Sequence, residues 1–268
     1  MSGEIKLFYS RRRNGEVNFG DDISPMLVAE LTGRKVVHAR VSGCDMAAIG
    51  SIIEMIAERR MKRVLHGRFD PVLVWGSGCL MPGKSISRLY MKPLALRGPR
   101  TAQRLGNPAV PFGDPGLLFD RLVPPGPEKK YRWGVIAHYT DADAPGLAKV
   151  LENTPRAVNI PVNAPPLETL QRIGECDFIA SSSLHGLIAA DCYGIPNLRL
   201  KFSANLEATD GKFHDYAAPI GRSHIAEVAI PDSGNLDDLL PGLEDPLSYH
   251  ANIAPVADAL EKALRDAL

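Results

Sequence analysis

Short apolar runs alternate with amphipathic segments along almost the whole chain, and this alternation is its most constraining feature. The run at 71–75 (PVLVW) is nearly continuous in apolar side chains, as expected for a strand of a parallel sheet covered on both faces. Similar runs predict strands at 5–9, 35–39, 92–96, 110–112, 133–137, 157–160, 177–180 and 196–200. Helical spacing predicts helices at 24–31, 49–56, 99–105, 144–151, 167–174, 184–193 and 253–268. Strands that alternate with helices indicate an α/β protein.

Residues 123–130 (VPPGPEKK) interrupt the alternation. Three prolines, one glycine and three charged residues are typical of a linker between domains. We therefore predict two doubly wound, Rossmann-like domains, 1–124 and 131–268. Because ligands of such folds bind beyond the carboxyl ends of the strands, the predicted site is the cleft between the two domains. An arrangement in which the C-terminal helix packs back on the first domain stays open.

The composition excludes several classes of protein. The chain has 268 residues, enough to bury a core, and its 31 Lys and Arg balance 31 Asp and Glu, so its charge gives no case for nucleic-acid binding. No acidic or Cys/His cluster has the spacing of metal ligands, so we predict neither a metal nor another cofactor. Without a signal-like N-terminus or an apolar run of about 20 residues, the predicted location is the cytoplasm.

The segment 177–196 contains a strand, three serines and a histidine at the start of a helix. Ser182 or Ser183 is placed to cap that helix, whose free N–H groups and dipole form a ready site for an anion. His185 lies in the first turn, and its ordinary pKa suits a general acid or base. The alternative is a structural histidine that packs on its own helix and bonds to a serine.

Two further predicted sites follow strands of the first domain. Arg97 lies at the carboxyl end of a strand and Arg100 at the start of the next helix, where a guanidinium can bind a carboxylate or phosphate. A solvated surface arginine is the alternative for each. Ser77 and Gly78 follow the strand at 71–75, and the glycine lets the backbone approach a ligand closely.

The remaining candidates also lie at strand ends. Asn18 and Asp21 follow the first strand and could bind sugar hydroxyls, and Gly20 permits a sharp turn; a plain turn with a helix cap is the alternative. His138 ends the first strand after the linker and faces the proposed cleft, and a structural histidine is the alternative. Lys201 follows the strand at 196–200 and could pair with an anion, although the position fits a solvated lysine equally well.

The runs 58–63 (ERRMKR) and 11–13 (RRR) form local basic patches. Such patches are usually solvated faces of a protein. Their functional interpretation is contact with an anionic, lipid-carried substrate near the inner membrane surface.

Seven segments, taken in order, resemble the polysaccharide pyruvyltransferase family, most closely its exopolysaccharide ketal-pyruvate transferases of succinoglycan-type biosynthesis. They are FYSRRRNGEVNFGDDISP, WGSG, LRGPRTAQRLG, FGDPGLL, WGVIAHYTD, SSSLHGLIAADCYGIPNLRL and KFHDYAAPIG. The resemblance implies a glycosyltransferase-B-like fold with phosphoenolpyruvate in the cleft, and it implies that His185 and Arg97 are needed for activity. Many relatives have an Arg-Asp pair where this chain has Arg97 and Gly98, so an acid at that position is not carried over.

The reaction that the resemblance implies moves the pyruvyl group of phosphoenolpyruvate to a sugar as a cyclic ketal. The first domain would hold the acceptor, a lipid-linked oligosaccharide, and the second would hold phosphoenolpyruvate. Cationic residues and the helix start would bind its carboxylate and phosphate, namely Arg97, Arg100, Lys201, Ser182 and Ser183. His185 would move protons. The chain would work in the cytoplasm or peripherally at the inner face of the plasma membrane.

Two other functions stay open. A nucleotide-sugar glycosyltransferase of the same architecture would need a carboxylate that holds a ribose, and Glu175, Asp177 and Asp191 are available. A non-catalytic carbohydrate-binding subunit is the alternative of another class, against which the joint presence of His185 and Arg97 counts. The choice between phosphoenolpyruvate and a uridine nucleotide distinguishes the two transferases.

Overall fold

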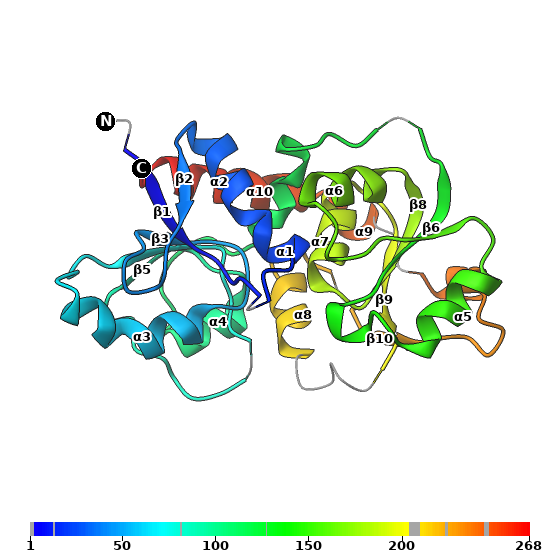
Figure 1. The fold of residues 1–268 in the computed structure, drawn as a ribbon, viewed down its shortest axis with the longest axis horizontal. Helices are drawn as coiled ribbons and strands as arrows, with labels where there is room; N and C mark the ends of the chain where they lie inside the picture. The colour runs from blue at the N-terminus through cyan, green and yellow to red at the C-terminus, as the bar shows by residue number, and fades with distance from the viewer. Residues whose placement is uncertain are drawn as a thin grey trace.

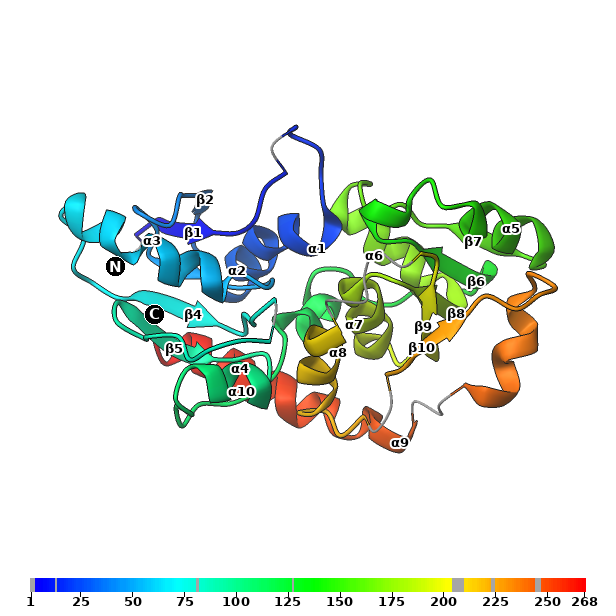
Figure 2. The same cartoon turned by 90° about the horizontal axis from the view of Figure 1, so that it is seen from below.

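The computed structural model describes residues 3–12, 14–80, 82–126, 128–203, 210–222, 225–243 and 247–268. Its strands form two five-stranded parallel sheets, each packed against helices (Figure 1, Figure 2). Of the basic run at 11–13, Arg13 lies outside the described residues.

The first sheet is built from the N-terminal part of the chain. Its strands are β1 (Ile5–Phe8), β2 (Val36–His38), β3 (Met46–Ala47), β4 (Val72–Trp75) and β5 (Met91–Ala95), in the order β2-β1-β3-β4-β5. The accompanying helices are α1 (Phe19–Asp22), α2 (Ser24–Thr32), α3 (Ile53–Leu65) and α4 (Pro99–Arg104), followed by the 3-10 helix η1 (Pro115–Arg121). Gly33 ends α2 in the left-handed conformation, with a φ of 64°, as the sequence predicts.

The second sheet begins after the proline-rich segment. Its strands are β6 (Tyr131–Ile136), β7 (Ala157–Asn159), β8 (Cys176–Ser181), β9 (Asn197–Lys201) and β10 (Glu227–Ala229), in the order β10-β9-β8-β6-β7. The helices here are α5 (Pro145–Asn153), α6 (Pro166–Gly174), α7 (Leu184–Cys192), α8 (Asp210–Ala217), α9 (Leu247–His250) and α10 (Ile253–Arg265). The 3-10 helices η2 (Tyr139–Asp141) and η4 (Leu236–Gly242) also lie in this part.

Both sheets arrange their strands in the same order, counted along the chain as second, first, third, fourth and fifth. In each sheet the chain starts inside, runs to one edge and then fills the other side. This leaves a switch point between the first and third strands, beyond whose carboxyl ends ligands of open α/β sheets bind. The two switch points lie between β1 and β3 and between β6 and β8. The predicted fold of two doubly wound α/β units is confirmed.

The C-terminal helix α10 returns to the first sheet. The indole Nε1 of Trp75 in β4 donates a hydrogen bond of 2.8 Å to the carbonyl oxygen of Leu260 in α10. One apolar core cluster contains residues of both sheets and of α10, so the two parts of the chain share a core. The C-terminus lies near the first sheet in the two views (Figure 1, Figure 2). The domain boundaries at 124 and 131 stay a prediction.

Short elements account for most differences from the predicted pattern. β3 has two residues and β10 has three, which is too short for a periodic signal. The helix predicted at 49–56 begins only at Ile53, because Ile49 and Ile52 lie in the buried stretch between β3 and α3. The strand predicted at 110–112 is a single bridge between Leu96 and Phe112.

Candidate functional site

A cavity of about 230 Å³, here called the switch-point cavity, lies where the two switch points face each other. Its wall is formed by the segments that follow β1, β3, β6 and β8, by the start of α3 and by α8. Its lining residues are Ser10, Asn18, Asp21, Gly50, Ser51, Ile52, Met55, Leu80, His138, Tyr139, Ser183, Leu184, His185 and Lys212. Five of them were expected from the sequence as site residues, namely Asn18, Asp21, His138, Ser183 and His185.

His185 is half-buried in the first turn of α7. Its Nε2 is buried and has no hydrogen-bond partner among the described residues. Burial lowers the pKa of His185 to about 3, and the positive charges of Lys212 and Arg97 lower it further. At neutral pH the imidazole is therefore uncharged. Its Nε2 can then donate or accept a hydrogen bond, depending on the tautomer.

The serines before α7 divide their roles. Ser183 is the N-cap residue and lines the cavity, but its side chain makes no capping hydrogen bond. The hydroxyl of Ser182 accepts a hydrogen bond from the backbone N–H of His138 (2.8 Å) and donates one to Asp141 (2.8 Å), so it braces the cavity wall. The helix α7 thus presents an N-terminus without a side-chain cap to the cavity, which favours an anion there.

His138 follows β6 and faces the cavity from the other side of the second switch point. Its Nδ1 lies 2.8 Å from the Thr140 hydroxyl and accepts a hydrogen bond from the backbone N–H of Thr140 (3.3 Å), and this backbone contact favours the neutral tautomer with its hydrogen on Nε2. Burial lowers the pKa of His138 to about 4, and the charge of Lys212 contributes to this shift. The second sheet therefore supplies two neutral imidazoles.

Lys212 on α8 is a charged cavity residue that the sequence analysis did not single out. It is 8% exposed, and no hydrogen bond joins its ammonium group to another described residue. Burial lowers its pKa to about 8, with further contributions from Arg97 and Arg199, so it is still mostly cationic at neutral pH. The segment KFHDYAAPIG contains this lysine, but one lysine beside a phenylalanine gives no signal of its own.

Asn18 and Asp21 line the opposite wall, at the entry into α1. The side-chain amide of Asn18 donates a hydrogen bond of 2.6 Å to Asp21. Burial raises the pKa of Asp21 to about 7, although this hydrogen bond opposes the shift. Gly20 packs on the imidazole of His185, since a Cβ atom there would lie 1.9 Å from Nδ1. Only glycine at this position lets the two parts of the chain close around His185.

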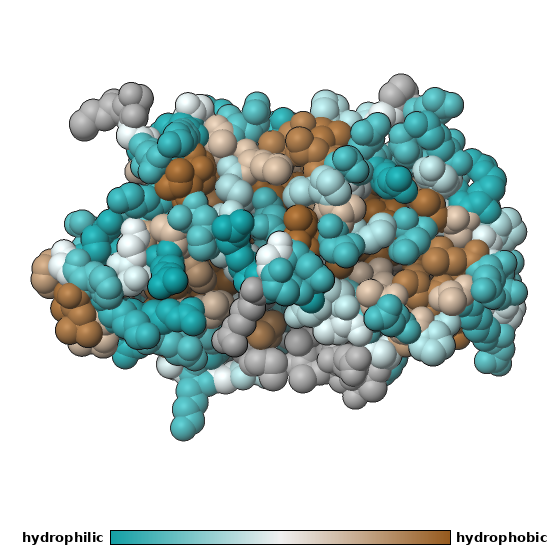
Figure 3. All heavy atoms as spheres, in the orientation of Figure 1, coloured by the Kyte–Doolittle hydropathy of each residue, from teal (hydrophilic) through white to brown (hydrophobic). Residues whose placement is uncertain are grey.

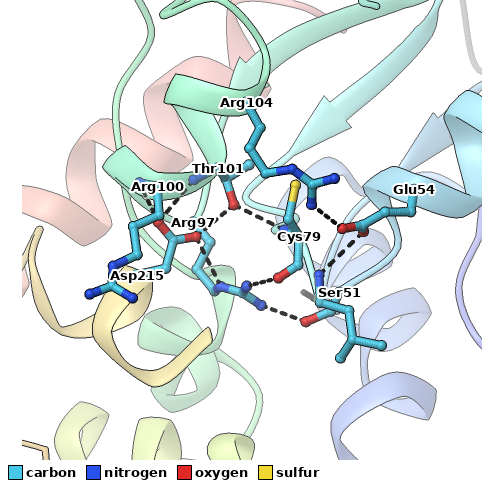
Figure 4. Close-up of polar contacts among 9 residues, drawn as sticks. Ser51, Glu54, Cys79, Arg97, Arg100, Thr101, Arg104 and Asp215 are labelled. Atoms are coloured by element: carbon cyan, nitrogen blue, oxygen red, sulfur yellow. Dashed lines mark hydrogen bonds and ion pairs between the residues drawn. The ribbon is translucent and has the colours of Figure 1, made fainter. Parts of the chain in front are cut away.

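Arg97 is buried beside the cavity and does not line it. Its guanidinium is 1% exposed and donates hydrogen bonds to Ser51 Oγ (2.7 Å) and to the carbonyl oxygen of Cys79 (2.5 Å). Its Nε lies 3.5 Å from a carboxylate oxygen of Asp215 (Figure 4). Its direct partners are therefore protein groups, and it contacts the cavity wall through Ser51.

Asp215 on α8 caps the start of α4. It accepts hydrogen bonds from the backbone N–H groups of Arg100 (2.8 Å) and Thr101 (3.1 Å) and from the Thr101 hydroxyl (2.6 Å) (Figure 4). A Cβ atom on Gly98 would lie 1.8 Å from the backbone carbonyl oxygen of Asp215 and 2.6 Å from its Oδ1, so glycine here makes room for both the backbone and the carboxylate of α8. The exposed side chain of Arg100 lines a separate cavity of about 300 Å³ beside α4.

Three other predicted ligand residues do not line the switch-point cavity. Ser77 is fully buried, and its hydroxyl donates to a backbone carbonyl. The N–H of Gly78 donates to the carbonyl of Gly50 (3.1 Å). Lys201 lies 3.5 Å from a carboxylate oxygen of Glu227 in β10. These residues form the surroundings of the cavity rather than its surface.

Neither a group of metal ligands nor an acidic thiol is found around the cavity in the part of the chain that the structure describes. The described residues contain no group of three His, Cys, Asp or Glu side chains that could hold a metal ion. Burial raises the pKa of all four cysteines to about 11 or 12, and none of them lines the switch-point cavity. Nor does any described helix have the length and apolarity to span a membrane.

The sequence model of the polysaccharide pyruvyl transferase family matches residues 16–201, more than half of the chain. The chain belongs to this family. The match includes Asn18, Asp21, Arg97 and His185, and it ends before α8, so Lys212 lies beyond it. The expected family is confirmed.

Two curated relatives match most of the chain. The succinoglycan biosynthesis protein ExoV of Rhizobium meliloti (strain 1021) is 25% identical over 244 residues, which cover 89% of this chain and 72% of the relative. The uncharacterized protein L143 of Acanthamoeba polyphaga mimivirus is 26% identical over 215 residues, which cover 77% of this chain and 72% of the relative.

Similarity to solved structures is weak. The functionally uncharacterized protein KP1_0663 from Klebsiella pneumoniae subsp. pneumoniae NTUH-K2044 has a TM-score of 0.46 and 12% identity, and the match covers 84% of this chain and 92% of the other. MurG of Acinetobacter baumannii has a TM-score of 0.32 and 10% identity, over 98% and 94% of the two chains.

Proposed function

We propose that this chain transfers the pyruvyl group of phosphoenolpyruvate to two hydroxyls of a sugar, in a surface polysaccharide or its lipid-linked precursor. Two C–O bonds form between the sugar oxygens and C2 of phosphoenolpyruvate, and the bond from C2 to the phosphate oxygen breaks. Of the two hydroxyl protons, one ends on the methylene carbon, which becomes a methyl group, and the other leaves with phosphate. The site must therefore bind two anionic groups and move two protons.

This proposal is carried by Lys212, a largely buried lysine whose ammonium group has no hydrogen bond to another described residue, in a cavity that also receives the N-terminus of a helix. Lys212 supplies the positive charge, and the start of α7 at Ser183 supplies N–H donors. The carboxylate and phosphate of phosphoenolpyruvate match these groups. The Nε2–H of His138 offers a further donor on the same side of the cavity.

Asp21 and His185 are the groups placed to move the protons. Because burial raises the pKa of Asp21 to about 7, much of this carboxyl is protonated at neutral pH and can act as an acid. Burial lowers the pKa of His185 to about 3, but a bound phosphate raises it again. We assign Asp21 as the acid that protonates the methylene carbon and His185 as the base that accepts the proton of a sugar hydroxyl.

Arg97 acts in this proposal as a positioning residue. Its two hydrogen bonds fix Ser51, in the loop after β3, and the backbone at Cys79. Its charge also contributes to the lowered pKa values of His185 and Lys212. Loss of Arg97 would then impair activity without any direct contact between the guanidinium and phosphoenolpyruvate.

The wall that belongs to the first sheet suits the sugar. Asn18, Asp21 and Ser51 offer an amide, a carboxyl and a hydroxyl group to the cavity. These groups can both donate and accept hydrogen bonds, as recognition of neighbouring sugar hydroxyls requires. The proposal therefore places the acceptor against the first sheet and phosphoenolpyruvate against the second.

The carboxylates that a nucleotide-sugar glycosyltransferase could use do not line the cavity. Asp191 is fully buried and accepts hydrogen bonds from two tyrosines, an asparagine and an arginine. Glu175 and Asp177 lie at the start of β8, at the edge of the sheet opposite the carboxyl ends, and Glu175 pairs with Lys130 (2.6 Å). These positions favour the pyruvyl transferase over this alternative.

The test measures phosphate release and ketal formation from phosphoenolpyruvate with a panel of glycosides. The native chain should release phosphate only when a suitable sugar is present, and His185→Ala should slow this by about 10²–10⁴-fold. His214→Ala is the matched control, because this exposed histidine lies on α8 outside the cavity.

Two results would contradict the proposal. No turnover, together with thermal stabilisation by a uridine nucleotide but not by phosphoenolpyruvate, would favour a glycosyltransferase. Sugar binding without turnover or phosphoenolpyruvate binding would favour a non-catalytic subunit.

A further inference from the structure

A second cavity, of about 360 Å³ and here called the outer cavity, adjoins the switch-point cavity. It lies between the segment 10–18 and the carboxyl ends of β6 and β7. This is the edge of the second sheet at which ligands of such folds bind. Figure 3 shows hydrophilic side chains on this face between the segment before α1 and α5, with hydrophobic side chains among them.

Two segments of the chain line both cavities. Tyr139, which follows β6, lines each of them, so the cavities adjoin at its side chain. The segment between β1 and α1 gives Ser10 and Asn18 to the switch-point cavity, and Arg12 and Glu16 to the outer cavity. A molecule that binds to the first-sheet wall of the switch-point cavity therefore has the outer cavity beside it.

Packing holds the boundary between the two cavities in place. The guanidinium carbon of Arg12 lies 4.6 Å from the centroid of the Tyr139 ring, and Arg12 forms an ion pair with Glu16. The centroid of the His138 ring lies 4.1 Å from that of Tyr139. The phenol hydroxyl of Tyr139 has no hydrogen-bond partner among the described residues. It is therefore free to bond to a molecule that lies across the boundary.

The charges of the outer cavity disfavour a second anion. Its ionisable lining residues, apart from Tyr139, are Arg12, Glu16 and Asp143, which leaves one negative charge in excess. Because Arg12 is paired with Glu16, its charge is already compensated. A phosphate or a nucleotide would meet like charge here, which opposes binding. The outer cavity therefore favours a neutral ligand.

The rest of the lining combines side-chain amides with an apolar floor. Asn159 ends β7 and Asn163 precedes α6, and neither amide group has a hydrogen-bond partner among the described residues. An amide can both donate and accept, as a sugar hydroxyl can. Ala137, Leu147 and Val162 are buried at the base of the cavity. They offer an apolar surface to the C–H groups of a sugar ring.

We propose that the outer cavity binds the neutral sugar that precedes the acceptor sugar in an oligosaccharide, with Asn159 and Asn163 as its binding residues. The inference rests on the proposed function, which places the acceptor sugar in the switch-point cavity. That cavity has about 230 Å³, below the roughly 300–1,000 Å³ of pockets that enclose a drug-sized ligand. Sugars beyond the reacting one must therefore lie outside it.

The cavity beside α4 is the other route for the sugar chain, since it adjoins the switch-point cavity at Leu80. Its charged lining residues are Arg100, Arg104 and Asp215, which leaves one positive charge in excess. The carboxylate of Asp215 is already bound by the start of α4. This cavity suits an anion better than a neutral sugar.

The experiment measures pyruvyl transfer to the methyl glycosides of glucose and galactose, and to cellobiose, gentiobiose, laminaribiose and lactose. At least one disaccharide should have a kcat/KM about tenfold or more above that of the glycoside of its terminal sugar, mainly through a lower KM. Asn159→Ala with Asn163→Ala should lower kcat/KM for that disaccharide by roughly tenfold, and for the glycoside by less than about twofold.

Gln171→Ala is the matched control, because this exposed amide lies on α6 outside both cavities. It should leave the preference for the disaccharide unchanged. Thermal unfolding of the double variant should match that of the native chain, since both asparagines are exposed.

An NMR titration of the same sugars without phosphoenolpyruvate separates this inference from the proposed function. If disaccharides bind more tightly than glycosides and the double variant loses the difference, the outer cavity binds sugar even when no pyruvyl transfer occurs. The inference is overturned if no disaccharide exceeds its glycoside in either turnover or binding. It is also overturned if the double variant keeps the preference, or if Arg100→Ala removes it, because the chain would then leave past α4.

Discussion

The two sheets share one strand order, but they place different functional groups in the cavity between them. The switch point of the first sheet contributes an amide, a carboxyl and a hydroxyl from Asn18, Asp21 and Ser51. The second contributes two imidazoles, from His138 and His185, and α8 adds an ammonium group.

This difference separates what topology decides from what side chains decide. The order of the strands fixes where a ligand can bind, since both switch points open at carboxyl ends of strands. The residues that follow those strands then fix which ligand binds. One wall suits a neutral, hydroxyl-rich molecule, and the other suits an anion.

Removal of Arg97, which supports the wall formed by the first sheet, should have the largest effect on stability. Arg97→Ala leaves the carboxylate of Asp215 buried without its ion pair, so we expect a loss of about 3–5 kcal/mol in the free energy of unfolding, measured by urea denaturation. Arg100→Ala, which removes an exposed side chain, should change it by less than about 0.5 kcal/mol. Full stability with lost activity in Arg97→Ala would instead argue that this arginine contacts the substrate.

Gly20→Ala should disturb the contact between the two walls. The new Cβ atom would lie 1.9 Å from Nδ1 of His185, so the imidazole must move. Misplacing a reacting group by about 1 Å costs roughly 10²-fold in kcat/KM. Gly43→Ala is the control, because a Cβ atom there meets nothing within 4 Å. Native kinetics in Gly20→Ala would show that the position of His185 does not matter.

The pH dependence of activity should reflect the titration of Asp21 on the first wall and of Lys212 on the second. Burial raises the pKa of Asp21 to about 7 and lowers the pKa of Lys212 to about 8, so Asp21 loses its proton above about pH 7 and Lys212 loses its proton above about pH 8. We expect kcat/KM for phosphoenolpyruvate to fall above pH 7, by about tenfold per pH unit up to about pH 8 and more steeply beyond it.

The bound complex should behave differently. A bound anion raises both pKa values, so the fall in kcat should begin at a higher pH than the fall in kcat/KM. Any residual turnover of Asp21→Asn should lack the first step of the profile. A profile that rises up to pH 9 would contradict the assigned protonation states.

The smallest expected effect is the change in stability caused by Lys212→Met. The pKa of Lys212 is lower in the folded chain than its ordinary value of 10.5, so the unfolded chain binds more protons between pH 8 and 10.5 and native stability rises across that window. The substitution should remove this dependence and stabilise the fold at pH 7 by roughly 1–2 kcal/mol, seen as a higher Tm. Lys92→Met, at an exposed lysine of β5, should show neither change.

The position of the cavity could be predicted from the sequence, because it depends only on the order of the strands and on where they end. His185 and Asp21 follow strands that the periodic pattern predicts, and parallel strands end at one edge of a sheet. Arg97 also follows such a strand, but its side chain meets Ser51, Cys79 and Asp215. These partners come from distant segments, so local sequence could not reveal its burial.

Lys201 and Lys212 illustrate the other limit. Lys201 follows β9 as predicted, but its partner Glu227 lies in β10, a strand of three residues that gives no pattern. Lys212 lies on a helix of eight residues that is not placed directly after a strand, so strand-end reasoning did not select it.

The most direct test of the division between the walls is calorimetric titration of phosphoenolpyruvate into the native chain, Lys212→Met and Asp21→Asn. The account predicts that Lys212→Met weakens binding by about 10²-fold or more, because a buried charge-assisted contact is lost. It predicts that Asp21→Asn binds within a few-fold of the native chain while losing turnover. If Asp21→Asn lost the affinity and Lys212→Met kept it, phosphoenolpyruvate would lie against the first sheet and the account would be wrong.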